Sequence, residues 1–427
     1  MELSLIILFS RALLNSGASS NLIQSSAEAL VKKFHCDEFR LVITSEALIA
    51  SAKMGSDDRV VEIENRRDTA LSGNAYILEK LLIWAEGVNT SKKSLVTLKS
   101  ELMEMIKTPR LYKRFYYPLA SGIGSAMVGF MLGGGWVDLA IIFISACVVE
   151  WIQILSSKWK KIPSSIVGLL AVAVGGIIAA ELTLQFSSTN YFINIVSSMI
   201  FFMPGRTMIL GIMELISGNS TLGVKRVVNA SVLMLSMIVG IAIAMSVVPD
   251  NIAIVKSPVT LTLFSGWVGH LLGAGSTALL AISLTVYYSI QKRFALFYAM
   301  GGFLVQLCYM VVTKQFLMPG YVGAFVALAV LTLFAYRFQK FLGYSGRLNA
   351  TPAYYVSAMM AVALFPGVGF IRAIDGFIRI AQSSLVGVSN GLVTETLYYS
   401  ANTLVTLVSM ILAIVITASI IENGRSH

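Results

Sequence analysis

Two short apolar segments, each closed by a Pro-Gly pair, constrain the fold of this chain more than any other feature. The first runs from Tyr191 to Met203 before Pro204-Gly205, and the second runs from Ala353 to Phe365 before Pro366-Gly367. A helix rises about 1.5 Å per residue, so neither segment alone crosses a hydrocarbon core that is about 30 Å thick. Short apolar segments broken by Pro and Gly at matching places in two halves indicate the discontinuous helices of a repeat-built transporter.

The composition places most of the chain in a membrane. Of the 427 residues, 56% are hydrophobic and 13% are charged, with a mean hydropathy of +0.78, whereas a soluble chain carries about 25% charged residues. Residues 1–114 hold 16 of the 32 Lys and Arg and 14 of the 22 Asp and Glu. The excess behind the net charge of +10 lies in short loops of the remaining part, which fits membrane orientation better than nucleic acid binding.

Residues 1–114 are predicted to form a small α+β domain. Phe39, Leu41 and Ile43 alternate with other residues in a strand that continues through residue 50, and a second strand covers residues 60–63. The expected helices of this domain are 2–15, 18–34, 69–87 and 91–107.

The rest of the chain is predicted to be an all-α polytopic membrane domain of ten spans, in two five-helix repeats at 115–250 and 251–427. The fourth span of each repeat is broken and continues as an amphipathic segment, to residue 224 in the first repeat and to residue 388 in the second. The expected spans are 117–133, 137–156, 162–184, 190–205, 227–248, 259–290, 294–312, 318–336, 352–367 and 391–421.

The basic residues of the loops predict the orientation, because cytoplasmic loops carry an excess of Lys and Arg. With the N-terminal domain in the cytoplasm, only Lys256, Lys314, Arg372 and Arg379 fall outside. An odd number of spans per repeat then inverts the second repeat relative to the first, which is the architecture of alternating access. The basic residues that fall inside are Lys158, Lys160, Lys161, Arg206, Lys225, Arg226, Lys292, Arg293, Arg337, Lys340, Arg347 and Arg425.

The segments after the two Pro-Gly pairs hold the candidate site. Each is expected to keep its polar residues on one helical face that lines a cavity, where a freed helix N-terminus binds a carboxylate and an acid carries a proton. The alternative is that both segments lie flat at the bilayer surface as amphipathic linkers. The first face holds Thr207, Gly211, Glu214, Gly218, Thr221 and Lys225, and the second holds Arg372, Asp375, Arg379 and Gln382.

Three acids are candidates for proton coupling. Glu214 and Asp375 follow their Pro-Gly pairs, and Glu150 lies within an apolar span, although it could also be an inner-interface residue. Asp138 and Glu181 lie near span ends, where an acid reaches water at little cost, so they receive no role. The expected substrate-binding residues are Pro204, Gly205, Arg206, Pro366, Gly367, Arg372 and Arg379.

No enzyme, cofactor or metal motif stands out. The three cysteines are scattered without metal-ligand or CxxC spacing, and the chain has no HExxH, GxSxG or P-loop sequence. Without a P-loop the chain cannot by itself couple transport to ATP, which leaves an ion gradient or passive flux.

Several of these segments together resemble the bacterial threonine/serine exporter family. The resemblance covers nearly the whole chain, with an N-terminal module to about residue 250 and a smaller C-terminal module fused to it. It implies export across the inner membrane driven by the proton motive force, but it does not fix the substrate, because some relatives with separate subunits are linked to dicarboxylate efflux. The segments are Leu14–Ala18, Thr44, Ser51, Arg59–Ile63, Gly133–Trp136, Met203–Gly205 and Phe365–Gly369.

The sequence therefore predicts a multi-pass inner-membrane secondary transporter that exports threonine or serine in exchange for protons. The alternative substrate is a small dicarboxylate such as succinate, for which Arg206, Arg372 and Arg379 would clamp the carboxylates. A membrane-bound hydrolase or a sensor that uses the N-terminal domain is another class, although His35 is the only histidine of residues 1–114. The expected partners are the small-molecule substrate, protons and the lipid bilayer, and assembly into a homo-oligomer is left open.

Overall fold

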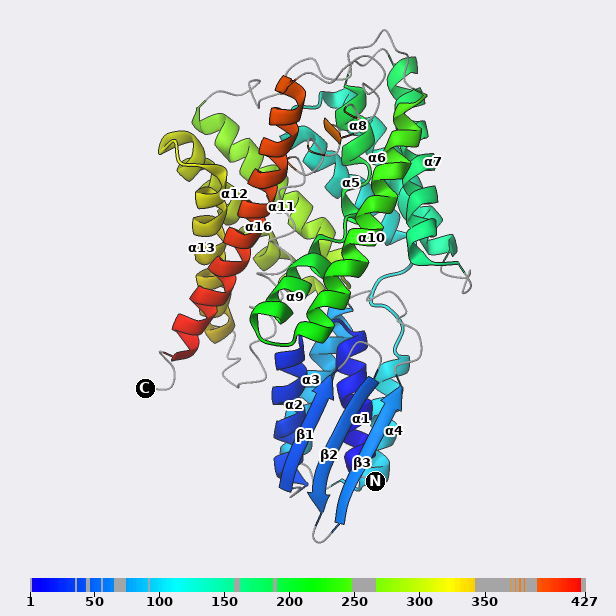
Figure 1. Cartoon of the computed structure of the whole chain (residues 1–427), viewed down its shortest axis with the longest axis vertical. Helices are drawn as coiled ribbons and strands as arrows, with labels where there is room; N and C mark the ends of the chain where they lie inside the picture. Colours follow the sequence, from blue (N-terminus) through cyan, green and yellow to red (C-terminus); the bar gives the residue numbers. More distant parts are fainter. Residues whose placement is uncertain are drawn as a thin grey trace.

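A computed structural model describes residues 2–34, 37–43, 47–54, 57–64, 74–90, 93–156, 162–186, 190–247, 266–341 and 390–423, with single positions between 369 and 380. Long helices form a bundle, and an N-terminal part of three strands and four helices stands at one end of it (Figure 1). The lower end of the last helix lies on the same side of the bundle as this N-terminal part.

In the N-terminal part, helices cover one face of a small antiparallel sheet. Its elements are α1 (Glu2–Asn15), α2 (Ser20–Lys33), β1 (Asp37–Ile43), β2 (Ala47–Met54), β3 (Asp57–Glu64), α3 (Ala75–Thr90) and α4 (Leu95–Lys107). The strand order is β1-β2-β3, and both pairs are antiparallel. The sheet forms because apolar residues alternate along β1: Ile43 is buried, whereas Val42 on the other face is 52% exposed.

The expectation of one continuous strand from residue 39 to residue 50 is wrong. The register places Ile43 opposite Leu48, so the chain reverses between β1 and β2. The physical reason is in the sequence, since three polar residues, Thr44-Ser45-Glu46, interrupt the apolar alternation there. Helices α1 to α4 and strand β3 overlap the predicted ranges.

Helix α1 is apolar but too short to span a membrane. It is instead the core of the N-terminal part, because Leu5, Ile6, Ile7 and Phe9 are at most 1% exposed. The sheet and helices α2, α3 and α4 surround it (Figure 1).

The bundle confirms a mostly helical, polytopic membrane protein. Seven helices of the described residues are long and apolar enough to span a membrane, and a bent pair raises the number to eight. Helix α5, with 16 residues, is too short to count among these seven. The elements are α5 (Tyr116–Met131), α6 (Trp136–Ser156), α7 (Ser164–Gln185), α8 (Tyr191–Ser197), η1 (Ile200–Phe202), α9 (Gly205–Ile216), α10 (Ser220–Met245), α11 (Trp267–Tyr287), η2 (Lys292–Phe294), α12 (Ala295–Met310), η3 (Val311–Gln315), α13 (Gly320–Phe341) and α16 (Asn390–Asn423).

The first Pro-Gly pair breaks the chain as expected. The segment of α8 and η1 meets α9 at an angle of 55°, and Pro204 and Gly205 at the break are buried. Proline has no backbone N–H and crowds the preceding turn, so a straight helix cannot continue through this position.

The polar face predicted to run from Thr207 to Lys225 is wrong beyond Gly218. Gly218 has a φ of +85° and ends α9, because glycine adopts this left-handed conformation at little cost. Thr221 and Lys225 therefore lie on α10, whereas Thr207 and Glu214 lie on α9.

Helices α5 and α11, which are predicted to begin the two repeats, run in opposite directions. Near one end of the pair, the Thr277 hydroxyl of α11 donates to the Met131 sulfur of α5 at 3.4 Å. Near the other end, the Tyr117 hydroxyl of α5 and the Ser289 hydroxyl after α11 are 2.7 Å apart. This is the relation that an inverted repeat requires.

The second Pro-Gly break lies outside the described residues, as do Arg372, Asp375 and Arg379. Two glycines of this segment are described and contact α16. A Cβ added to Gly369 would meet Thr403, and one added to Gly376 would meet Thr396. The chain at these two positions therefore runs antiparallel to α16, as α9 runs antiparallel to α10.

Candidate functional site

The helix after the first break is held by the N-terminal part. Arg206, in the first turn of α9, is only 7% exposed. Its Nη2 donates to the backbone oxygen of Gly17 at 3.2 Å, and its guanidinium lies over the ring of Tyr288, 5.3 Å from the ring centre. This residue, predicted to bind substrate, thus touches both the α1–α2 loop and the end of α11.

Glu214, in the last turns of α9, is 2% exposed and makes the central contact with the same loop. Its Oε1 accepts the backbone N–H of Ser20 at 2.8 Å, and its Oε2 accepts the Ser20 hydroxyl. Arg226 of α10 donates to the same carboxylate at 3.3 Å and to the backbone oxygen of Ala18 at 2.9 Å. We call Arg206, Glu214 and Arg226, with the loop Gly17–Ser20, the α9 clamp.

The local sequence explains why this loop fits the clamp. Gly17 has a φ of +86°, which turns the chain after α1. Ser19 then caps α2 by accepting the Leu22 amide, and the N–H of Ser20 in the first turn of α2 donates to Glu214. Because a helix N-terminus carries partial positive charge, it favours a carboxylate such as Glu214.

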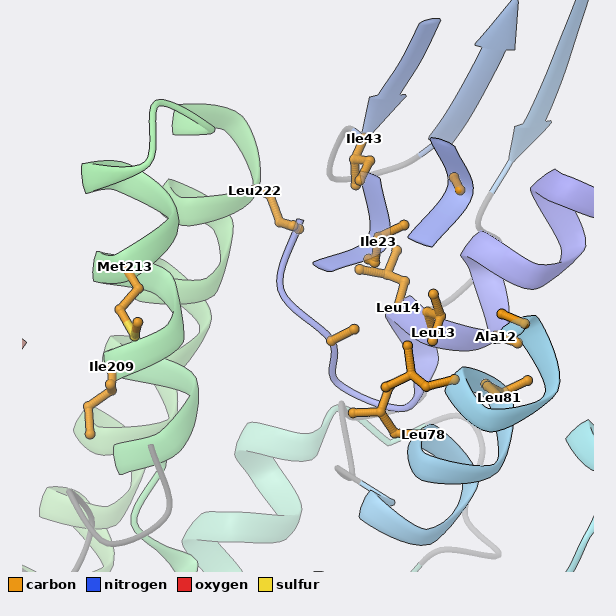
Figure 2. Packing of buried hydrophobic residues seen from close by; sticks show 14 of the residues in the cluster. Ala12, Leu13, Leu14, Ile23, Ile43, Leu78, Leu81, Ile209, Met213 and Leu222 are labelled. Atoms are coloured by element: carbon orange, nitrogen blue, oxygen red, sulfur yellow. The ribbon is translucent and has the colours of Figure 1, made fainter. Parts of the chain in front are cut away.

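Apolar side chains support the clamp on both sides. Ile209 and Met213 of α9 and Leu222 of α10 are buried in the same cluster as Leu13 and Ile23. Figure 2 shows Leu222 beside the N-terminal part, with Ile209 and Met213 on the neighbouring helix α9. The hydrophobic core is therefore continuous between the N-terminal part and the bundle.

The predicted acid Glu150 lies on α6. It is 5% exposed, and its Oε2 has no hydrogen-bond partner among the described residues, nor has the Nε2 of Gln153 one turn further. Its carboxylate interacts electrostatically with Arg110 and with Tyr287 of α11. The Tyr287 ring in turn packs edge-on against Phe201 of η1, with ring centres 5.3 Å apart. Tyr287 thus connects α11 to the segment that precedes the break.

A polar cluster that received no role from the sequence lies in the first half. Asp138 is 3% exposed at the start of α6. One of its oxygens accepts the Gly135 amide at 2.8 Å and the side-chain amide of Asn190 at 2.7 Å. The other accepts Nδ2 of Asn194 at 2.9 Å, and that nitrogen also lies 2.9 Å from the Thr183 hydroxyl. The missed signal is the pair Asn190 and Asn194, spaced one helical turn apart in an apolar segment.

All three features, the α9 clamp, Glu150 and the Asp138 cluster, lie within the stretch that matches a known family. The model described as "Putative threonine/serine exporter" (ThrE) matches residues 4–248, more than half of the chain. The chain belongs to this exporter family. The match begins in α1 and ends after α10, so it covers the N-terminal part and the helices α5 to α10.

Three named relatives share 22–30% identity with part of this chain. A "Probable succinate transporter subunit YjjP" of Klebsiella aerogenes is 23% identical over 55% of this chain and 89% of its own length. The protein of the same name from Escherichia coli K12 is 22% identical over 55% of this chain and 90% of its own length. "Pheromone-regulated membrane protein 10" of Pichia sorbitophila is 30% identical over 37% of this chain and 18% of its own length. No solved structure matches.

Membership of the exporter family makes this protein a multi-pass membrane transporter for a small molecule. The YjjP relatives are named as subunits, and they cover the part of this chain that ends near α10. Residues 249–427 of this exporter lie beyond the family match.

Proposed function

We propose that this protein exports threonine or serine across the inner membrane, driven by the proton motive force. The observation that carries the proposal is the broken span at Pro204, which lies inside the stretch that matches an exporter family. Broken helices supply backbone groups for substrate in the middle of a membrane, where an unbroken helix has none to offer.

The proposed substrate site lies where the two breaks approach each other between a first repeat, 115–250, and a second, inverted repeat, 251–427. Pro204, Gly205 and Arg206 contribute from the first break. The antiparallel packing of α5 and α11 supports the inversion. The proposed residues of the second break are Pro366, Gly367, Arg372 and Arg379.

Among the proposed coupling acids, Glu150 is the best placed. One of its carboxylate oxygens is buried without a hydrogen-bond partner in the described part of the chain, so it is available for a proton. Glu214 already binds Ser20 and Arg226, and a proton there would have to open the α9 clamp. Asp375 remains the proposed counterpart in the second repeat.

The N-terminal domain, residues 1–114, is proposed to lie in the cytoplasm. The excess of basic residues on loops of that side supports it, as does the position of the last helix end on the same side (Figure 1). In a variant whose three cysteines are replaced, a new cysteine at Lys314 should react with an impermeant maleimide in whole cells. Reaction only after permeabilisation would reverse the orientation.

A small dicarboxylate is the second candidate substrate, because two relatives are named as succinate transporter subunits. Arg206 would then clamp a carboxylate, but its guanidinium is already engaged by Gly17 and Tyr288. The description of the matching family as a threonine/serine exporter makes the amino acid the stronger candidate.

Counterflow in proteoliposomes that contain the full chain tests the substrate. Vesicles preloaded with unlabelled threonine, serine or succinate are diluted into a trace of the labelled compound. We expect labelled threonine and serine to accumulate transiently and succinate not to. Accumulation of succinate alone would transfer the function to a dicarboxylate, and no counterflow with any of the three would favour a sensor or hydrolase.

A further inference from the structure

Four polar side chains in the interior of the first half have buried atoms that lack a hydrogen-bond partner in the described structure. They are the hydroxyls of Ser125, Ser145 and Ser197 and the Oδ1 of Asn194. All four residues are 0% exposed. A buried polar atom that makes no hydrogen bond carries the full cost of leaving water, so such a group in a native protein calls for an explanation.

Neighbouring hydroxyls show that the helices could have satisfied these serines. The Thr183 hydroxyl donates to the Ala179 carbonyl at 2.6 Å, and the Ser198 hydroxyl donates to the Ile195 carbonyl at 2.6 Å. The usual bond to the preceding turn is therefore made by Ser198 but not by the adjacent Ser197. The side chain of Ser197 is free to bind something else.

The unpartnered atoms come from helices that meet around α8. Asn194 and Ser197 lie one turn apart on α8, and Ser145 shares a face of α6 with Asp138, to which Asn194 is bonded. Ser125 precedes Gly129 by one turn of α5, and a Cβ built on Gly129 would lie 3.6 Å from the Cβ of Ser197. Figure 1 shows α8 at the end of the bundle opposite to the N-terminal part.

This region contains the acid Asp138 and no basic side chain on its helices. Nδ2 of Asn194 donates to a carboxyl oxygen of Asp138. This bond fixes the orientation of the Asn194 amide and leaves its Oδ1 as a spare acceptor. Both hydrogens of Nδ2 have acceptors, on Asp138 and on Thr183. The sequences of α5, α6, α7 and α8 contain no Lys or Arg. Spare oxygen acceptors in a region with an acid and without basic side chains suit a cationic donor, not an anion.

We propose that Asn194 Oδ1 and the Ser197 hydroxyl, one turn apart on α8, bind the primary ammonium group of the transported amino acid beside Asp138, at a site separate from the Pro204 break. The hydroxyls of Ser145 and Ser125 contribute from the facing helices. An ammonium has three N–H donors and no acceptor, which matches a site with acceptors to spare. This inference rests on the proposed export of threonine or serine, and it makes the first half the part that selects an amino acid over a dicarboxylate. An alkali cation would use the same oxygen atoms.

The pair Ser197→Ala and Ser198→Ala tests the site, because the two adjacent serines are equally buried and only Ser198 has its hydrogen bond. Binding of L-serine to the purified full chain is measured by intrinsic fluorescence. We expect Ser197→Ala to weaken binding about tenfold, since a hydrogen bond to a charged group is lost, and Ser198→Ala to change it less than twofold. Equal affinities of the two variants would overturn the proposal.

The thermal midpoint without ligand separates binding from folding. Removing an unpaired hydroxyl should leave stability unchanged or raise it, whereas removing a bonded one lowers it. Ser197→Ala is therefore expected to keep or raise the midpoint while it loses affinity. A fall in both would make Ser197 a structural residue and contradict the proposal. Asn194→Leu, of similar volume, should also lose affinity for L-serine.

Competition with L-glycerate and the exchange of sodium for choline distinguish an ammonium group from an alkali ion at this site. L-glycerate, which has a hydroxyl in place of the ammonium, should not compete with L-serine, and competition with equal affinity would overturn the proposal. Replacing sodium chloride with choline chloride should leave L-serine binding unchanged, and a loss would assign the oxygens to an alkali ion instead. If the wild type shows serine counterflow but Ser197→Ala binds L-serine as tightly as the wild type, only this ammonium site is rejected. If the wild type shows no serine counterflow, the proposed function is rejected.

Discussion

The Oε1 atom of Glu214 accepts the backbone N–H of Ser20 at 2.8 Å, although the two residues are 194 positions apart. The bond joins the first turn of α2 in the N-terminal part to α9, the helix that follows the break. Arg226 closes the same contact from α10. Any movement of α9 during transport must therefore move the N-terminal part or release this bond.

Glu214→Gln is expected to destabilise the protein by about 3 kcal/mol, because Arg226 stays buried without its counter-charge. Both side chains are 2% exposed, so water cannot take over the interaction. Thermal unfolding of the purified protein measures the loss, and Glu181→Gln, at an exposed position of α7, is the control. If Glu214→Gln instead unfolds like the wild type and loses only proton-driven flux, Glu214 is a coupling residue rather than a clamp.

Gly17→Ala should open the α9 clamp for two reasons. The φ of +86° costs a residue with a side chain about 1–2 kcal/mol, and the new Cβ would lie 2.7 Å from Nη2 of Arg206. Gly218→Ala is the matched control, because its φ is +85° and nothing lies within 4 Å of an added Cβ. The crowding predicts a larger fall in thermal midpoint for Gly17→Ala, and equal falls would show that Arg206 moves aside freely.

Replacing both Pro204 and Gly205 with Ala should allow a straighter helix and stop transport, while the protein still reaches the membrane. The reason is that the 55° bend depends on a residue that cannot continue the hydrogen-bond ladder. Serine counterflow is the readout, and Pro163→Ala before α7 controls for loss of a proline. Counterflow at the wild-type rate in the double variant would reduce the break to a packing kink.

The sequence predicts those parts of the fold that depend on local pattern. Apolar runs predict eight of the ten expected spans within the described residues, if the bent pair is counted as one span. Pro204-Gly205 predicts the break, because both features follow from the chemistry of a few adjacent residues. The turn at Gly218 was missed because a polar face with helical spacing continues through it, and only the φ of +85° ends α9 there.

The contacts of the site depend on pairs that are far apart in the chain, and no local pattern contains them. The residues adjacent to Glu214 in the sequence do not indicate that its partner is Ser20, so the sequence predicts a position in a cavity instead. Asp138 received no role because an acid near a span end is expected to reach water. In the structure, Asn190 and Asn194 cover it. Glu150, by contrast, was recognised from its apolar neighbours, and it is buried as expected.

A second contact between the N-terminal part and the bundle predicts a pH effect. Glu79 of α3 accepts Arg293 at 2.6 Å and Gln291 at 2.9 Å. Burial raises the pKa of Glu79 above its ordinary value, and this outweighs the lowering by Arg293 and Gln291. A carboxyl with a raised pKa in the folded state loses stabilising free energy as pH rises from its unfolded pKa to its folded pKa.

The thermal midpoint of the wild type minus that of Glu79→Gln should therefore fall as pH rises from about 4 toward neutral, and then level off. Arg293→Gln should extend the fall to higher pH, because the arginine holds the pKa of Glu79 down. A midpoint difference that rises with pH would show that the ion pair dominates over burial.

The most direct test of the account is uphill serine flux driven by an imposed pH gradient. Proteoliposomes with the wild-type chain should accumulate labelled L-serine against its own gradient, in exchange for protons, and a protonophore should abolish the accumulation. Glu150→Gln should keep serine counterflow but lose the uphill flux, because glutamine at this buried position cannot take up and release a proton. Uphill flux that persists with the protonophore, or that Glu150→Gln leaves unchanged, would contradict proton-driven export through this residue.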